Sequence, residues 1–469
     1  MSNPDIEGTI ETDLLARLDR IPWTTWHSYI FAILFAGVIL EGFSISLGGA
    51  TLGSLEIAFH LSAFEAIILT PIYLLGALVG AFLMGSLSDI MGRKRIFIAT
   101  VIIVIIGSLI VALSFNYGSL ILGRIVTAIG AEGEVAVANT ALAEFVQPKL
   151  RGFIVASGNA TAFDVGTFAA SLVGFYAITL LPADIGWRVA FSSAIILGLI
   201  VFFARLKMPE SVRYLIKKKR FQEAEKIVSE IEAMYEKKTG KKLSPVTPEI
   251  ISFSKQSAGQ KYVYLFKKYP KEIALAITLN LTEVWPYYSA FSVIPAILIK
   301  FFKFTPKQSS LSLIYITLAG VAGIIVMSLA LDYIGRRKTI TISYGIAALM
   351  WLIIALISSI VSIAFFILLL VILYFWVYAA AGVLYPQISE MFPTEVRNTA
   401  VGTAIGIGRL GGIIGIIVLA ALLSKGTLVV FAITAAVMAV GAIAEFLVGP
   451  ETSQKSLEVT SKENISKKG

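Results

Sequence analysis

Five charged residues interrupt long apolar stretches of the sequence, where no water stabilises a charge. They are Glu41, Glu134, Asp164, Glu283 and Arg409. A charge at the bilayer centre costs roughly 2.5 to 3.5 kcal/mol even on insertion scales, so each is a functional hypothesis by default. A carboxylate can carry a proton, and a guanidinium presents a planar fork of donors that matches a carboxylate ligand. We therefore predict proton exchange by the four acids and anion binding by Arg409.

Membrane-spanning helices must position these residues. Of all residues 57% are hydrophobic and 15% are charged, and the mean hydropathy is +0.84, whereas soluble domains carry about 25% charged residues. A hydrocarbon core about 30 Å thick needs about 20 apolar residues per helix. The sequence predicts an all-α membrane protein with twelve spans, at residues 26–50, 63–87, 96–115, 119–144, 153–181, 187–206, 273–300, 309–331, 339–360, 364–391, 399–423 and 429–448.

The rise per residue of a helix places all five charges near mid-depth. Glu132 lies about 200° from Glu134 on the same helix, so both cannot point directly into one cavity. We prefer Glu134 for the cavity and expect Glu132 to bond a neighbouring helix, and the reverse assignment stays open. Because the acids outnumber the single Arg, at least one is expected to bind protons reversibly. The alternatives are structural acids that stay neutral or paired, and an Arg409 held permanently by Asp164.

Basic residues in short loops predict the orientation, since cytoplasmic loops keep an excess of Lys and Arg. Residues 93–95, Lys149, Arg151 and 336–338 fall on one side, which we take as cytoplasmic. Lys300, Lys303 and Lys307 are exceptions on the other side. The net charge of +9 is assigned to the cytoplasmic face and not to nucleic-acid binding. Arg124, at the outer start of the fourth span, is interpreted as an entrance or interhelical anchor.

Composition divides the chain into five segments. We predict a cytoplasmic N-terminal segment (1–25) without a cleaved signal peptide, a six-helix bundle (26–206), a charged cytoplasmic linker with amphipathic helices (207–270), a second six-helix bundle (271–449) and a cytoplasmic tail (450–469). The chain has no cysteine and two histidines, so neither a disulfide framework nor a metal site is expected.

Three short patterns recur at nearly one offset, which indicates a tandem duplication. Asp89-x-x-Gly92-Arg93-Lys94 returns as Asp332-x-x-Gly335-Arg336-Arg337, Glu144 and Arg151 return as Glu390 and Arg397, and Pro209-Glu210-Ser211 returns as Pro450-Glu451-Thr452. Each Gly turn presents basic side chains beside an acid at a helix end. We interpret Gly85, Asp89, Gly92, Arg93, Glu144, Arg151, Asp332, Arg336, Glu390 and Arg397 as a conformational latch, and simple topology anchoring is the alternative.

These motifs resemble the major facilitator superfamily over nearly the whole chain. The resemblance implies two pseudo-symmetric six-helix bundles that move a solute by alternating access, with the first, fourth, seventh and tenth spans lining the cavity. ARLDRIPWTTWH at 16–27 resembles the segment before the first helix of aromatic-acid and niacin-type proton symporters, and EMFPTEVRNTAVG at 390–402 looks closer to organic-ion and aromatic-acid transporters. PESVRYL at 209–215 is shared with sugar porters, whose Gln-Leu-Ser signature is missing from the seventh span.

The resemblance also implies a substrate class. Arg409 lies in GIGRLGGIIG, similar to a segment of organic-ion transporters in which a basic residue goes with anionic substrates. Trp285, Tyr288 and Tyr378 could stack an aromatic acid. The predicted function is proton-coupled symport of a small organic anion by a monomer, with no cofactor and with substrate and membrane lipid as partners. Competitors are a cation or drug antiporter, a sugar symporter and a non-transporting sensor. The sequence contains no Gly-x-x-x-x-Gly-Lys-Ser motif, so we expect neither ATP-driven transport nor enzymatic chemistry.

Overall fold

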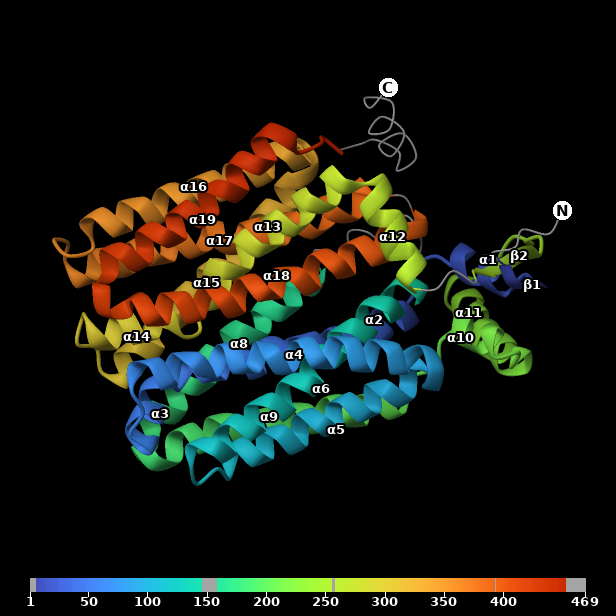
Figure 1. Ribbon diagram of the computed structural model, residues 1–469. Helices are drawn as coiled ribbons and strands as arrows, with labels where there is room; N and C mark the ends of the chain where they lie inside the picture. The colour runs from blue at the N-terminus through green and yellow to red at the C-terminus, as the bar shows by residue number, and fades with distance from the viewer. Residues whose placement is uncertain (1–5, 146–157, 255–257, 393, 453–469) are drawn as a thin grey trace.

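Two bundles of long helices make up most of the chain, as the computed structural model shows for residues 6–145, 158–254, 258–392 and 394–452 (Figure 1). The first half contains α2 (Thr25–Ala50), α4 (Ala63–Met91), α5 (Arg93–Ala112), α6 (Tyr117–Phe145), α8 (Asn159–Leu180) and α9 (Ala183–Leu206). The second half contains α13 (Pro270–Ser289), α15 (Pro306–Ile334), α16 (Arg336–Ile357), α17 (Ile363–Met391), α18 (Thr394–Leu422) and α19 (Thr427–Val448).

Within the described residues, ten of these helices are long and apolar enough to cross a membrane by length and composition. The other two, α6 and α13, carry the charges that lower their hydropathy, among them Glu132 and Glu134 on α6 and Glu283 on α13. Each of the twelve helices corresponds to one predicted span. The twelve-helix architecture is therefore confirmed, although the described part of the fifth helix begins at Asn159 because residues 153–157 lie outside the described ranges.

The first and seventh spans are each followed by a short helix after a break. After α2, α3 (Leu52–Phe59) begins beyond Thr51, and α14 (Val293–Lys300) follows α13, so the predicted span 273–300 is two helices. The two breaks touch each other across the halves, because a Cβ on Gly49 would lie 2.4 Å from the Phe291 carbonyl oxygen. Glycine is therefore required there for the close approach. We call this end, which carries α3 and α14, the far end.

The opposite end, called the linker end, carries the connecting segment. Its elements are α10 (Val212–Lys217), α11 (Phe221–Thr239), β2 (Glu249–Ser254) and α12 (Ala258–Lys268). The N-terminal segment adds β1 (Ile6–Thr12) and α1 (Leu14–Arg20). Strand β1 pairs antiparallel with β2, with Ile10 opposite Ile251. The amphipathic linker helices were predicted, but this pairing of the N-terminal segment with the linker was not.

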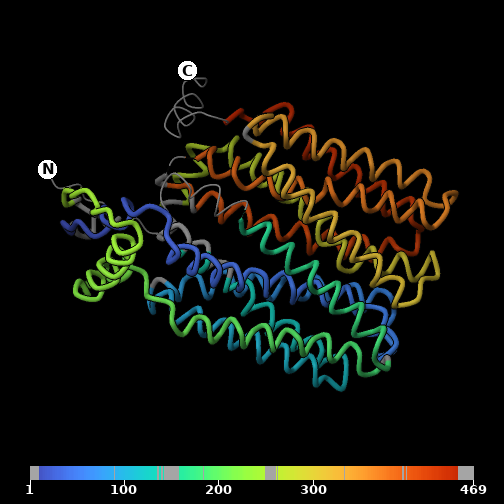
Figure 2. Tube along the Cα trace, turned by 180° about the vertical axis from the view of Figure 1, so that it is seen from behind, coloured from blue at the N-terminus to red at the C-terminus, as the bar shows by residue number. Residues whose placement is uncertain are grey.

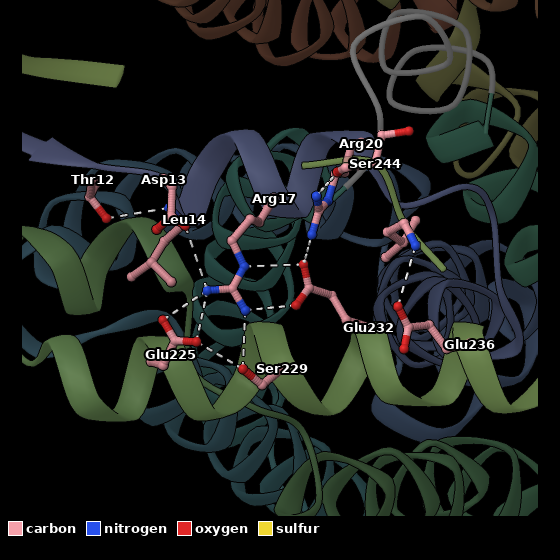
Figure 3. Close-up of polar contacts among 11 residues, drawn as sticks. Thr12, Asp13, Leu14, Arg17, Arg20, Glu225, Ser229, Glu232, Glu236 and Ser244 are labelled. Carbon is pink, nitrogen blue, oxygen red and sulfur yellow. Dashed lines mark hydrogen bonds and ion pairs between the residues drawn. The ribbon is translucent and has the colours of Figure 1, made fainter. Parts of the chain in front are cut away.

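A small separate core holds these elements together. Leu14 and Leu18 of α1 are buried against Leu215 of α10 and against Val228 and Ile231 of α11. Charged contacts surround it (Figure 3): Arg17 lies 2.7 Å from Glu225 and 2.6 Å from Glu232, and Arg20 lies 2.5 Å from Glu232. We call β1, α1, α10, α11 and β2 the terminal module. Figure 2 shows it standing outside the bundles at the linker end.

Candidate functional site

Arg409 lies where helices of both halves meet. Its Nη2 atom is 2.5 Å from Glu132 Oε2 on α6 and 3.8 Å from Glu41 Oε1 on α2. Its Nη1 atom donates a hydrogen bond of 3.1 Å to the Tyr288 hydroxyl on α13. The Arg409 side chain remains 12% exposed, whereas Arg124 and Arg205 are 1% and 0% exposed. Arg409 is therefore the most accessible of these three interior guanidinium groups.

The glycine-rich sequence around Arg409 explains why its side chain lies at the boundary between the halves. A Cβ on Gly411 would lie 2.5 Å from the Leu281 carbonyl oxygen on α13. A Cβ on Gly412 would lie 3.1 Å from Tyr288 and 3.2 Å from Leu74 on α4. Small residues let α18 approach both neighbours closely. The segment GIGRLGGIIG thus brings its one charged residue to the boundary between the halves.

A second polar contact crosses between the halves at Asp164. This α8 residue is fully buried and accepts a hydrogen bond from the Tyr287 hydroxyl of α13. The Tyr287 ring stacks on Tyr378 of α17, with 4.5 Å between the ring centroids. The alternative in which Asp164 holds Arg409 permanently is not what the structure shows, because Asp164 contacts Tyr287 and Arg409 pairs with Glu132. Glu283, one turn before Tyr287, is buried and has no ion-pair partner within the described residues.

Glu134 belongs to a different contact from those of Arg409 and Asp164. Its carboxylate is 1% exposed and forms an ion pair with Arg205 of α9, within the first half. The Thr100 hydroxyl donates a 2.8 Å hydrogen bond to Glu134, and the Arg205 guanidinium lies 4.6 Å from the centroid of the Phe97 ring. Glu134 was predicted to face the cavity and Glu132 to bond a neighbouring helix; in the structure Glu134 pairs with Arg205 of the first half and Glu132 with Arg409 of the second, which favours the reverse assignment. Arg205 was not among the predicted site residues, although it lies in the last turn of the predicted span 187–206.

The predicted aromatic residues separate into two places. Tyr288 contacts Arg409, and Trp285 is partly exposed and packs against α18, where a Cβ on Gly415 would lie 2.5 Å from its ring. Tyr378 is fully buried between Tyr287 and α15. Two of the three aromatic candidates therefore lie beside α18, and Tyr378 belongs to the Asp164 contact.

The first copy of the repeated loop motif has the expected tight turn. Gly92 takes φ +100°, and the following α5 begins with Arg93. Glu210 Oε1 accepts hydrogen bonds from the backbone N–H groups of Arg93 at 2.8 Å and Lys94 at 3.3 Å. The Pro-Glu-Ser motif thus places a carboxylate at the N-terminus of α5, where the helix dipole stabilises a negative charge. Sequence reasoning found this motif but not its function.

The second copy has the same geometry. Gly335 takes φ +95°, and Glu451 Oε1 accepts a 2.8 Å hydrogen bond from the backbone of Arg336. The Arg336 side chain also pairs with Glu390 at 3.2 Å, and Arg397 donates a 3.3 Å hydrogen bond to the Phe392 carbonyl. Gly85 lies within α4, where its carbonyl accepts a 2.8 Å hydrogen bond from the Ser88 hydroxyl. The remaining predicted latch members are outside the description: the side chains of Asp89, Glu144 and Asp332, and all of Arg151.

Arg124 connects two helices of the first half. Its Nη1 donates a 2.7 Å hydrogen bond to the Ser44 carbonyl of α2, and its guanidinium lies 4.4 Å from the centroid of the Tyr73 ring on α4. Of the two roles considered for Arg124, these contacts correspond to an interhelical anchor.

Comparisons with known proteins place this geometry in a family. The family model described as "Sugar (and other) transporter" matches residues 30–463. The chain is 26% identical over 454 residues to the niacin transporter NiaP of Acinetobacter baylyi, covering 95% of this chain and 99% of the relative. It is 30% identical over 470 residues to the putative metabolite transport protein YdjK of Escherichia coli, covering 97% and 98%.

Solved structures give the same architecture. An inward open conformation of the xylose transporter XylE from E. coli matches with a TM-score of 0.74 and 18% identity, covering 93% of this chain and 99% of that one. At this identity the likeness shows the fold alone. The chain therefore belongs to the "Sugar (and other) transporter" family, whose members are multi-pass membrane transporters.

Proposed function

We propose that this protein is a secondary active transporter that carries a small organic anion together with a proton by alternating access. The observation that carries the proposal is the partly exposed guanidinium of Arg409 at the boundary of the two halves. A guanidinium binds carboxylates through two parallel hydrogen bonds. A monocarboxylate bound there would contact both halves, because Glu132 and Glu41 come from the first half and Tyr288 from the second.

Anion binding is coupled to proton binding in this proposal because the substrate carboxylate and Glu132 compete for the Arg409 guanidinium. Glu132 occupies one edge of Arg409 at 2.5 Å, so an incoming carboxylate must share or displace this contact. The charges of Arg409 and ionised Glu132 cancel, and a bound monoanion adds one negative charge. A proton on Glu132 restores neutrality in a water-poor site, where an uncompensated charge is expensive. One proton per monocarboxylate is therefore the proposed stoichiometry, with Glu41 as a second acid 3.8 Å from Arg409.

Asp164 and Glu283 are proposed as further proton sites. The hydrogen bond from Tyr287 to Asp164 joins α13 to α8. Such a contact between halves must change when they rock against each other. A change of protonation at Asp164 would therefore favour one conformation over the other. Glu134 is a weaker candidate, because Arg205 already compensates its charge.

The substrate is proposed to be a monocarboxylate or aromatic acid. Tyr288 contacts Arg409, and Trp285 packs against α18 at Gly415. Aromatic faces pack favourably against flat rings. The relative from A. baylyi is named a niacin transporter. Niacin is an aromatic monocarboxylate, so nicotinate is the first probe to try.

The proposed location is the cell membrane, with the linker end and both termini in the cytoplasm. Residues 93–95 and 336–338 start α5 and α16 at the linker end, as the positive-inside rule requires. The latch motifs then lie on the cytoplasmic side, where they would bias the conformational equilibrium. Since one chain contains both halves and the whole site, the proposed unit is a monomer.

Uptake into proteoliposomes tests this function. With the outside acidic, purified protein should accumulate labelled nicotinate above its external concentration, and an uncoupler should abolish the accumulation. The same gradient with Arg409→Gln is the control, which should show no uptake. Uptake that ignores both the pH gradient and the uncoupler contradicts proton coupling. Accumulation of a lipophilic cation or a sugar, with no response to carboxylates, contradicts the assignment of an anion.

A further inference from the structure

The linker helix α12 has an apolar face that the protein covers only in part. At 100° per residue, Leu265, Tyr269, Tyr262, Phe266 and Val263 fall on one arc. Leu265 and Tyr269 are buried, and the Tyr269 ring lies 6.0 Å from that of Phe392 at the end of α17. In contrast, Tyr262, Val263 and Phe266 are 39%, 54% and 46% exposed. One edge of the arc therefore anchors α12 to the second half, and the rest lies free.

The opposite arc of α12 is polar and basic. Lys267 and Lys268 are exposed and occupy the last turn, and Lys271 follows at the start of α13. The Lys268 ammonium donates a 2.7 Å hydrogen bond to the Tyr264 hydroxyl and lies 5.1 Å from the centroid of its ring. Exposed aromatic residues beside a cluster of lysines are typical of helices that lie in a membrane interface.

The direction of α12 supports the same location. Figure 1 shows α12 running across the long axis of the bundle helices, at the linker end where α13 begins. Because the bundle helices cross the bilayer, a helix that runs across their direction at this end can lie along the membrane surface. Its last residue, Lys268, is two positions before Pro270, where α13 starts. This is the depth at which a spanning helix enters the headgroup layer.

The other long linker helix, α11, provides a contrast within the chain. Its apolar residues Ala224, Val228 and Ile231 are buried in the core of the terminal module against α1 and α10. Protein thus covers the centre of the apolar face of α11, and Phe221 and Met234 remain 40% and 50% exposed near the two ends of the helix. In α12, by contrast, Tyr262, Val263 and Phe266 form one continuous exposed apolar patch.

We propose that α12 is an interfacial helix that binds the anionic surface of the membrane at the linker end. Val263 and Phe266 insert between acyl chains, and Lys267 and Lys268 contact anionic lipid headgroups. The apolar and electrostatic contributions act together, because a basic residue near an anionic surface adds to the binding of the apolar face. The helix would thereby hold the start of α13 at a constant depth.

Site-directed spin labelling of the full-length protein tests this proposal, since the chain contains no cysteine. Phe266→Cys is labelled in liposomes that contain phosphatidylglycerol, and collision rates with oxygen and with a water-soluble nickel complex are measured. Met234→Cys on α11 is the matched control, because Met234 and Phe266 are 50% and 46% exposed. We expect the ratio of oxygen to nickel accessibility to be several-fold higher at 266 than at 234. Equal ratios overturn the proposal, as does loss of both accessibilities at 266, which would indicate a protein partner.

The headgroup contribution is tested with Lys267→Gln/Lys268→Gln in the same labelled background. Each lysine near an anionic membrane surface contributes about 1 kcal/mol to binding, so the double variant should reduce the partitioning of α12 into the anionic surface by about 5-fold per lysine. The ratio of oxygen to nickel accessibility at position 266 in phosphatidylglycerol liposomes should then fall to its value in neutral phosphatidylcholine liposomes. Unchanged immersion of the double variant would overturn the preference for anionic lipid.

Discussion

Arg409 on α18 and Glu132 on α6 form an ion pair across the boundary between the two halves, with 2.5 Å between Nη2 and Oε2. Each residue belongs to a different bundle, so the pair must change its geometry whenever the bundles rock against each other. A substrate carboxylate would compete for the same guanidinium. In the proposed mechanism, this pair would link substrate, proton and conformation through one contact, and the first two predictions below depend on it.

The substitution Arg409→Gln should remove the binding of anionic substrate. Leaving one partner of a buried charged pair unmatched costs about 2 to 5 kcal/mol, which is about 30-fold to several thousand-fold in affinity. Arg409→Lys should retain part of the affinity, because an ammonium keeps the charge but loses the bidentate geometry. Ligand-induced thermal stabilisation with nicotinate measures both variants. Wild-type binding of a neutral or cationic ligand that Arg409→Gln leaves unchanged would contradict an organic-anion substrate.

The substitution Glu132→Gln should uncouple transport from the proton. Without the competing carboxylate, Arg409 stays available at all pH values, so the affinity for the anion should lose its pH dependence. Concentrative uptake in proteoliposomes should disappear, while exchange of internal for external substrate persists. A Glu132→Gln protein that still accumulates substrate against a gradient would show that the coupling proton binds elsewhere.

The substitution Glu134→Gln should instead destabilise the protein. It leaves the guanidinium of Arg205 buried without its counter-charge, which typically costs 3 to 5 kcal/mol. Thermal unfolding in detergent should show a clear fall in Tm for Glu134→Gln. Glu132→Gln, two residues away, is the matched control with a smaller fall. Replacing both partners, as Glu134→Leu/Arg205→Met, should recover part of the loss. Full stability of Glu134→Gln would argue against a structural ion pair.

The latch residues should control turnover and not affinity. Asp89→Asn and Arg93→Gln are expected to slow transport while the affinity for the ligand stays within a few-fold, because both belong to the junction of α4 and α5 and are not part of the proposed substrate site at Arg409. Asp332→Asn and Arg336→Gln should act in the same direction more weakly. Transport rates and thermal-shift titrations separate the two quantities. A large loss of affinity with unchanged accessibility of the two membrane faces would count against a latch.

The terminal module should loosen in acid. Burial alone would raise the pKa of Glu232, but hydrogen bonds from Arg17 and Arg20 outweigh burial and lower this pKa below its usual value. A carboxylate with a lowered folded-state pKa contributes stability above its unfolded pKa of about 4.3, and this contribution is lost as the pH falls through the folded value. Hydrogen exchange of residues 6–12, corrected for intrinsic rates, should stay constant from pH 7 to about 5 and increase below.

Arg17→Gln is the companion test of the module. Its guanidinium contacts Glu225 and Glu232, so its loss should weaken docking of the N-terminal segment by about 1 to 2 kcal/mol at neutral pH. The acid-induced change in exchange should also shrink. Arg220→Gln is the control, since Arg220 pairs with Glu223 on an exposed surface of the linker. Equal protection of residues 6–12 in wild type and Arg17→Gln would exclude a role for this ion pair in docking.

Some of this architecture was determined by the sequence alone. Lipid requires about 20 apolar residues per crossing helix, so hydropathy predicts the spans and their order with little help from packing. The turns at Gly92 and Gly335 were also predictable, because their positive φ is a local demand that favours glycine. The helix breaks after Ala50 and Ser289 were not predictable, because the apolar sequence continues through both of them.

The partners of the interior charges were decided by the tertiary structure. Depth along a helix follows from counting residues, but the direction of a side chain depends on which neighbours surround the helix. Glu132 and Glu134 differ by two positions, and only helix packing sends one to Arg409 and the other to Arg205. The pairing of β1 with β2 likewise joins segments about 240 residues apart. Local sequence carries no signal for such contacts, because each depends on where a distant segment comes to lie.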